Sequence, residues 1–242
     1  MNATAIAAAL VLLAATPARA AEDLSHVLRR SVEAYGGARS LSRLGAVKQT
    51  GSVTAPMRGN AVGRLVRIYA PPRNLRVDIS YPGGHEERRV LQGDRGWREG
   101  EPVQGMQLAA MVLQAARLEL PRIFFEDQGK VADAGEVARN GKKLRAVAID
   151  LGGGLALTAE IDPETGYILH TSGAGQVPEG MRISFETDYS DFRKVRGVLF
   201  AFHEENFANG VHTGVTVLEK VELLPAAPPA HTFRPGGKPE SI

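Results

Sequence analysis

The chain has 242 residues, and its charges nearly balance, with 29 Lys and Arg residues against 27 Asp and Glu residues. Proteins that bind nucleic acids need a clustered basic surface, so this balance argues against a nucleic-acid partner. The sequence contains no Cys, which excludes disulfide bonds, thiol nucleophiles, metal sites built from Cys and a lipid attached to an N-terminal Cys. Burial of apolar side chains must therefore hold the fold together.

Residues 1–20 are typical of a cleaved signal peptide. The apolar run from Ala5 to Ala15 is too short for a membrane-spanning helix, which needs about 20 apolar residues. It is followed by Pro17-Ala18-Arg19-Ala20, which places small residues at the two positions that signal peptidase inspects. We expect cleavage after Ala20 and export of a soluble chain to the periplasm.

The exported chain is predicted to form one domain, residues 21–224, followed by a Pro-rich tail, residues 225–242. No linker rich in Ser and Gly and no repeat of fixed period interrupts the first range. The tail contains a single Phe, Phe233, and no Trp or Tyr. We expect Phe233 to dock the tail on the body of the domain.

Two segments have the spacing of helices. Apolar residues recur at helical spacing from Leu24 to Tyr35, and Gly36-Gly37 gives a plausible C-terminal stop. The second segment, Gly105 to Leu118, is apolar around most of its circumference and ends before Pro121. Its simpler interpretation is a core helix packed on a sheet, and the functional alternative is a lid whose inner face meets a ligand.

Most of the remaining chain alternates between apolar and polar residues, as half-buried strands do. This pattern covers Leu75–Tyr81, Leu155–Ile161, Met181–Tyr189 and Val211–Leu223. Turn signals such as Asn140-Gly141 separate the runs, and short connections of this kind join antiparallel neighbours. The pattern predicts roughly ten strands in one meandering antiparallel sheet.

Basic residues occur in local pairs within these strand segments: Arg64/Arg67, Arg73/Arg76 and Arg88/Arg89. Because acidic residues lie nearby, we interpret the pairs as solvated strand faces. Contact with an anionic lipid headgroup is the alternative that stays open.

The sequence carries no recognisable catalytic motif. It lacks a Gly-x-Ser-x-Gly elbow, a phosphate-binding loop and a His-Glu-x-x-His pair. His203 and His212 could meet across one hairpin with Glu204 or Glu205 nearby, but facing polar residues on an exposed sheet explain them more simply than a metal site does. We therefore predict a protein without enzymatic activity, cofactor or metal.

Six short motifs, each weak alone, occur in one order along the chain. The first closes the N-terminal helix, the second opens a strand, the third lies in a hairpin, the fourth lies in a turn and the last lies in the tail. They are Tyr35-Gly36-Gly37-Ala38-Arg39-Ser40-Leu41, Val47-Lys48-Gln49-Thr50-Gly51, Gly93-Asp94-Arg95-Gly96-Trp97, residues 161–167, residues 189–200 and Phe233-Arg234-Pro235. The ordered set resembles the LolA-like proteins, which are outer-membrane lipoprotein carriers and sorting proteins of the bacterial periplasm.

The resemblance implies a mainly β (α+β) fold, in which a strongly curved antiparallel sheet forms an unclosed half-barrel. The N-terminal helix and the mid-chain helix would cover its concave face, and acyl chains would occupy the space between. In carriers of the family an Arg on an early strand holds the lid; Arg64 and Arg67 lie in that region, and the sequence does not choose between them.

The resulting functional hypothesis is a periplasmic binding or carrier protein for lipids or lipid-modified proteins, which it would exchange with donor or acceptor proteins of the inner or outer membrane. The alternative is an envelope interaction or stress-sensor module of the same fold, which works through a protein partner. Its oligomeric state is left open. The residues expected to line the apolar cavity are Trp97, Met106, Met111, Phe124, Phe185, Tyr189, Phe200 and Phe202.

Overall fold

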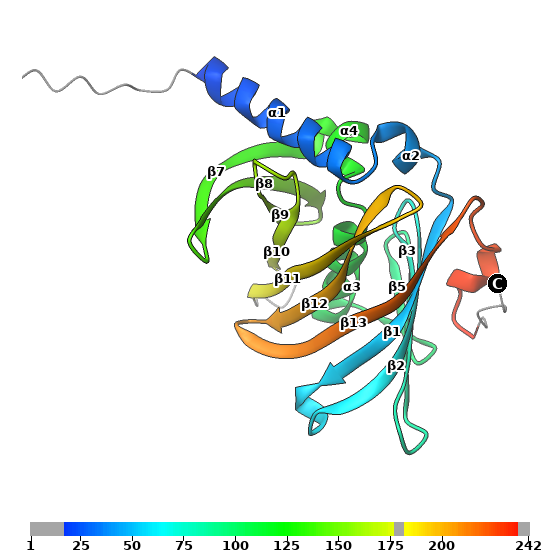
Figure 1. Ribbon diagram of the computed structural model, residues 1–242. Helices are drawn as coiled ribbons and strands as arrows, with labels where there is room; N and C mark the ends of the chain where they lie inside the picture. The colour runs from blue at the N-terminus through cyan, green and yellow to red at the C-terminus, as the bar shows by residue number, and fades with distance from the viewer. Residues whose placement is uncertain (1–16, 177–181, 237–242) are drawn as a thin grey trace, which may run out of the picture.

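The computed structural model describes residues 17–176 and 182–236 (Figure 1). The apolar run of the predicted signal peptide and Met181 lie outside these ranges. Within them, the strands form one antiparallel sheet of thirteen strands in the order β6-β5-β4-β3-β2-β1-β13-β12-β11-β10-β9-β8-β7. Among the described residues β6 does not pair with β7, so the curved sheet is an unclosed half-barrel, as predicted.

The strands are mostly consecutive neighbours joined by short turns, and β1 pairs with β13 to join the two ends of the chain. Their bounds are β1 Ala46–Ala55, β2 Ala61–Ala70, β3 Asn74–Ser80, β4 Glu86–Gln92, β5 Arg95–Arg98, β6 Glu101–Val103, β7 Val131–Arg139, β8 Lys142–Gly152, β9 Leu155–Ile161, β10 Ile168–Gln176, β11 Arg182–Val195, β12 Val198–Ala208 and β13 Val211–Leu224.

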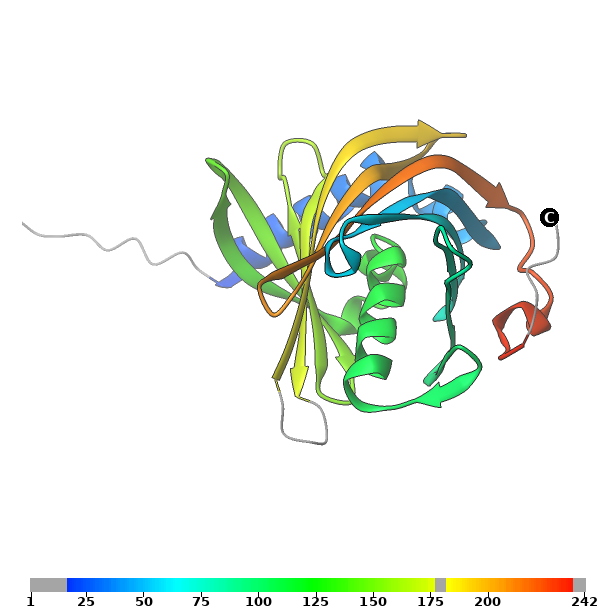
Figure 2. The ribbon, with the colours of Figure 1, turned by 90° about the horizontal axis from the view of Figure 1, so that it is seen from below.

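The helices occupy both ends of the chain and the middle of the sequence. Their bounds are α1 Pro17–Ala34, α2 Ala38–Ser42, α3 Gly105–Leu118, α4 Ile123–Glu126 and the short 3₁₀ segments η1 Pro56–Arg58, η2 Gln128–Lys130 and η3 Ala230–Phe233. Figure 2 shows α3 inside the curve of the sheet, while α1 crosses one end of the molecule beside α4. None of these helices is long and apolar enough to cross a membrane.

The segments in which apolar and polar residues alternate in the sequence are strands in the structure. On β3, Leu75, Val77 and Ile79 are buried in the main core, which lies between the concave face and α3. The structure contains more strands than the roughly ten expected. The extra ones are segments without a regular apolar face, such as the four-residue β5, the three-residue β6 and the largely exposed edge strand β7.

The predicted N-terminal helix ends where the two glycines require it to end. Gly36 and Gly37 have φ angles of 114° and 82°, which L side chains rarely adopt. A Cβ at Gly36 would also lie 2.8 Å from the carbonyl oxygen of Gly197. Helix α1 extends back to Pro17, so the predicted cleavage site after Ala20 lies within its range.

A second, smaller core lies on the convex side of the sheet. Phe233 of η3 is buried there with Ile68 of β2 and Val90 of β4, and Trp97 of β5 packs against the same cluster. The guanidinium of Arg76 donates a hydrogen bond of 3.2 Å to the carbonyl oxygen of Thr232, which fixes the same segment. The prediction that Phe233 docks the tail is confirmed.

Candidate functional site

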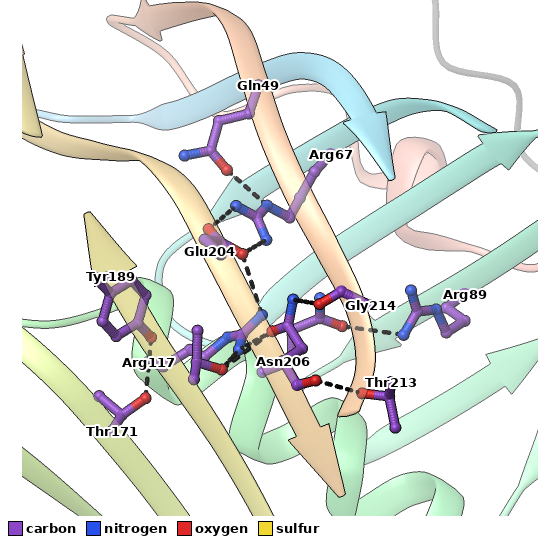
Figure 3. Close-up of polar contacts among 12 residues, drawn as sticks. Gln49, Arg67, Arg89, Arg117, Thr171, Tyr189, Glu204, Asn206, Thr213 and Gly214 are labelled. Carbon is purple, nitrogen blue, oxygen red and sulfur yellow. Dashed lines mark hydrogen bonds and ion pairs between the residues drawn. The ribbon is translucent and has the colours of Figure 1, made fainter. Parts of the chain in front are cut away.

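A buried ion pair lies on the concave face, between strands that are distant in sequence. Arg67 of β2 donates two hydrogen bonds to the carboxylate of Glu204 on β12, at 2.5 Å and 3.1 Å, and its Nε donates to Gln49 Oε1 of β1 at 2.6 Å (Figure 3). Arg67 and Glu204 are both almost completely buried. Paired and bidentate geometry of this kind is what makes a buried charge tolerable.

Arg117 connects α3 to this pair. Its guanidinium lies 3.4 Å from Glu204 Oε2, and it donates hydrogen bonds to Asn206 Oδ1 at 2.8 Å and to Thr187 Oγ1 (Figure 3). Thr187 lies on β11, and Glu204 and Asn206 lie on β12. The last turn of α3 is therefore held to the concave face by charged hydrogen bonds.

The two arginines set the charge state of Glu204. Burial acts to raise the pKa of this carboxyl group, but the positive charges of Arg67 and Arg117 outweigh burial and lower its pKa below the ordinary value. Glu204 is therefore ionised at neutral pH, and it balances two guanidinium groups at once.

A cavity of about 440 Å³ lies between α3 and the concave face, which falls within the roughly 300–1,000 Å³ of small-molecule sites. Its wall is apolar over much of its extent, with Leu65 and Ile79 from one arm of the sheet, Leu157 and Phe185 from the other, and Leu113 from α3. Arginines also line it.

A smaller cavity of about 110 Å³ lies toward the end of α3, under α2. Apolar residues again form much of its wall, including Leu41, Val47, Leu118 and Leu199. Arg117 and Thr171 line both cavities, so the network around Glu204 lies between them.

Three of the eight predicted cavity residues line these cavities. Phe185 faces the larger one, and Tyr189 and Phe200 face the smaller one. Burial raises the pKa of Tyr189, whose hydroxyl group lies 3.0 Å from Thr171 Oγ1. Whether these three residues contact a ligand stays a prediction.

The other five predicted residues do not line either cavity. Met111, Phe124 and Phe202 are buried in the main core, and Met106 is 41% exposed at the start of α3. Trp97 lies on the convex side with Phe233. Because adjacent residues of a strand face opposite sides, Trp97 points away from the concave face while its neighbour Arg98 lines the larger cavity.

The interpretation of the arginine pairs as solvated strand faces is wrong for Arg67 and Arg76, which are 1% and 0% exposed. Arg67 joins the network on the concave face, whereas Arg76 pairs with Asp78 on the convex face at 2.6 Å. Arg64 is exposed, so of the two candidates for an arginine that holds the lid, only Arg67 joins the network, and it is linked to α3 through Glu204 and Arg117.

Sequence reasoning did not find Gln49, Glu204 and Asn206 as members of one network. A signal was available, because each of these polar residues occupies a core-facing position in the alternation of its strand. Their convergence depends on the pairing of β1 with β13, which joins the β1–β2 hairpin to the β12–β13 hairpin across segments distant in sequence.

The two histidines considered for a metal site make other contacts. His203 Nδ1 lies 3.1 Å from Ser190 Oγ, and the His212 ring packs on Phe207 with centroids 5.2 Å apart. In the part of the chain that the structure describes, no group of three His, Asp or Glu residues is arranged to hold a metal ion.

Comparison with solved structures identifies the fold. A LolA superfamily protein from Nitrosomonas europaea is 10% identical and matches with a TM-score of 0.53 over 86% of this chain and 95% of that one. The chain has a LolA-like fold. No family model and no curated protein matches the sequence.

Two further solved structures match this chain at lower TM-scores, each over 86% of this chain and 95% of the other. An outer membrane lipoprotein-sorting protein domain from Vibrio parahaemolyticus has a TM-score of 0.48 at 9% identity. A DUF1329 family protein from Desulfovibrio piger has a TM-score of 0.44 at 9% identity. At such identities the likeness concerns the fold, and the function has to be argued from the site.

Proposed function

We propose that this protein is a non-catalytic periplasmic binding or carrier protein that holds the acyl chains of lipids or of acylated proteins. The observation that carries the proposal is the cavity of about 440 Å³ between α3 and the concave face, with an apolar wall built from both arms of the sheet. A saturated chain needs no specific polar contact there. Burial of each methylene is worth about 0.8 kcal/mol, so ten of them give roughly 8 kcal/mol before the costs of association.

Helix α3 is the lid in this proposal. Its middle turns pack into the main core through Met111 and Val112, so it is also a core helix. Its cavity side carries Leu113, Gln114 and Arg117. Loading would shift α3 against the sheet, and the hydrogen bonds of Arg117 would set how readily it moves.

Export fits the same proposal, with residues 1–20 as signal peptide and a carrier that begins at Ala21. N-terminal sequencing of the chain purified from the periplasm tests this part directly. A start at Ala21 supports it, and an unprocessed Met1 contradicts it.

The decisive experiment is native mass spectrometry of the full chain purified from an envelope fraction, followed by solvent extraction and by addition of fluorescent fatty acid to the delipidated protein. We expect a lipid adduct and saturable binding. A bare polypeptide that also fails to bind added lipid overturns the carrier proposal and favours the alternative, a module that works through a protein partner.

Two phenylalanines of β11 provide a matched pair for that assay. Phe185 lines the cavity, whereas Phe192 is also half-buried but contacts Tyr167 at 4.8 Å between ring centroids. Phe185→Asp is expected to weaken acyl binding by about tenfold or more, because it places a charge against the chain. Phe192→Asp is expected to leave the affinity unchanged. Equal losses in both variants would mean that the cavity is not the binding site.

A further inference from the structure

The larger cavity carries a marked excess of positive charge. Five arginines line it, against two glutamates, Glu87 and Glu186. Glu204 adds a third carboxylate through its contacts with Arg67 and Arg117, and two positive charges are still left in excess. A site for a purely hydrocarbon ligand has no need of this excess.

The excess is concentrated on one side of the cavity, around Glu87 of β4. Arg89 Nε lies 3.3 Å from its carboxylate, and Arg58 and Arg98 each approach it at 3.9 Å. One carboxylate therefore faces three guanidinium groups. Arg58 also lies over the ring of Tyr81, 5.3 Å from the centroid, which directs it toward the cavity wall.

Two of the arginines have a buried Nε–H that makes no hydrogen bond with any residue that the structure describes, namely Arg89 and Arg117. Arg89 Nε is close to the Glu87 carboxylate, but its contact at 3.3 Å is an ion pair without hydrogen-bond geometry. Arg89 is held in place by a bond from Nη1 to Gln114 Oε1 of α3 at 3.4 Å. Burial lowers the pKa of Arg89, because desolvation disfavours its charged form, and an anion beside it would offset this cost.

We propose that the ligand is an anionic amphiphile. Its carboxylate or phosphate headgroup binds at Arg58, Arg89 and Arg98, and its acyl chain extends along the apolar wall past Phe185. This inference rests on the proposed function, since it places the headgroup of the lipid that the cavity would hold. Guanidinium groups suit both headgroups, because they bind carboxylate and phosphate oxygens in a bidentate manner.

The test compares three ligands with the same oleoyl chain: oleate, 1-oleoyl-lysophosphatidate and the uncharged 1-monooleoylglycerol. We expect each anionic ligand to bind about tenfold more tightly than the uncharged one. The variant Arg58→Gln/Arg98→Gln removes two half-exposed arginines and is expected to bind all three ligands alike, with its affinity for monooleoylglycerol unchanged.

The control variant, Arg64→Gln/Arg95→Gln, removes the same charge from exposed positions of β2 and β5 that do not line the cavity. It should keep the preference for anions. Excess inorganic phosphate alone should not displace oleate. Displacement would identify a site for free anions and overturn the proposal that the ligand is an anionic amphiphile. Equal binding of all three ligands by the unmodified protein would overturn the headgroup inference and leave the proposed function standing. Binding of none of them would refute both.

Discussion

The carboxylate of Glu204 lies 3.4 Å from the guanidinium of Arg117, and this contact joins the last turn of α3 to the middle of the sheet. The same carboxylate is bonded to Arg67 on the opposite arm. A helix that packs only through apolar side chains can slide by small steps. Here the directional bonds of Arg117 fix α3 in one position. Any movement of the lid must therefore break these bonds and replace them with other hydrogen bonds of Arg117 and Glu204.

Removal of the shared carboxylate should destabilise the fold. Glu204→Gln leaves Arg67 buried without its counterion, and breaking one partner of a buried pair costs about 3–5 kcal/mol. We expect a loss in this range in the free energy of unfolding measured with urea. The control is Glu205→Gln on the next residue of β12, which faces the opposite side and should change stability by less than about 0.5 kcal/mol. A loss in Glu204→Gln no larger than that in Glu205→Gln would mean that Arg67 does not depend on Glu204 for its charge balance.

The lowered pKa of Glu204 predicts a loss of stability in acid. The folded-state pKa lies below the unfolded value of 4.5, so the ionised carboxylate stabilises the fold fully above 4.5 and this contribution is lost as the pH falls through the folded pKa. Unfolding free energies from about pH 7 to about pH 3 should therefore converge for the wild type and Glu204→Gln. If the two proteins instead lost stability in parallel as the pH fell, the assignment of an ionised carboxylate to Glu204 would be contradicted.

The architecture could be predicted because its causes are local. Alternation in a segment such as Leu75–Tyr81 and the glycines after α1 act within a few residues, and the sequence displays both. The count of strands was too low because β5, β6 and β7 are short or exposed, and their pairing depends on neighbours rather than on an apolar face of their own.

The site was harder to predict because it depends on register between distant strands. Arg67 is an ordinary strand arginine until Gln49 and Glu204 are placed beside it, 18 and 137 residues away in sequence. The sequence-based prediction places Trp97 at the cavity, whereas one position along β5 decides between the two faces of the sheet. A pattern of residue types does not reveal which face a large aromatic residue occupies in so short a strand.

Helix α3 packs so closely on β10 that a single methyl group added at Gly173 of β10 is expected to lower the stability of the fold. A Cβ at Gly173 would lie 2.6 Å from Leu113 Cδ2, and Leu113 is buried in α3. Gly173→Ala should therefore displace α3 and cost about 1–3 kcal/mol. Gly129→Ala is the control, because a Cβ there would meet no atom within 4 Å. Chemical denaturation measures both, and an unaltered stability for Gly173→Ala would show that the Leu113 side chain turns into the larger cavity without displacing α3.

Trp97 is the single Trp of the chain, so its fluorescence reports on the convex cluster. Phe233→Ala should shift its emission to the red and lower the unfolding free energy by roughly 3 kcal/mol, because the variant removes the side chain that packs the tail. Titration of the wild type with oleate should leave the emission unchanged, since Trp97 lines neither cavity. A large change on lipid binding would place Trp97 at the ligand after all.

Substitutions of two phenylalanines can distinguish a residue of the cavity wall from a residue of the packed core. Phe124 is 1% exposed, whereas Phe200 is half-buried and lines the cavity of about 110 Å³. A charge at Phe124 has no room for hydration, so Phe124→Asp should fail to accumulate as folded protein. A charge at Phe200 has such room, so Phe200→Asp should be secreted in folded form and should weaken the binding of acyl chains that extend from the larger cavity past Arg117 into this one. Circular dichroism and fatty-acid binding measure the two properties on the same samples. If Phe200→Asp also fails to fold, Phe200 belongs to the core, and acyl binding has to be assigned to the larger cavity alone.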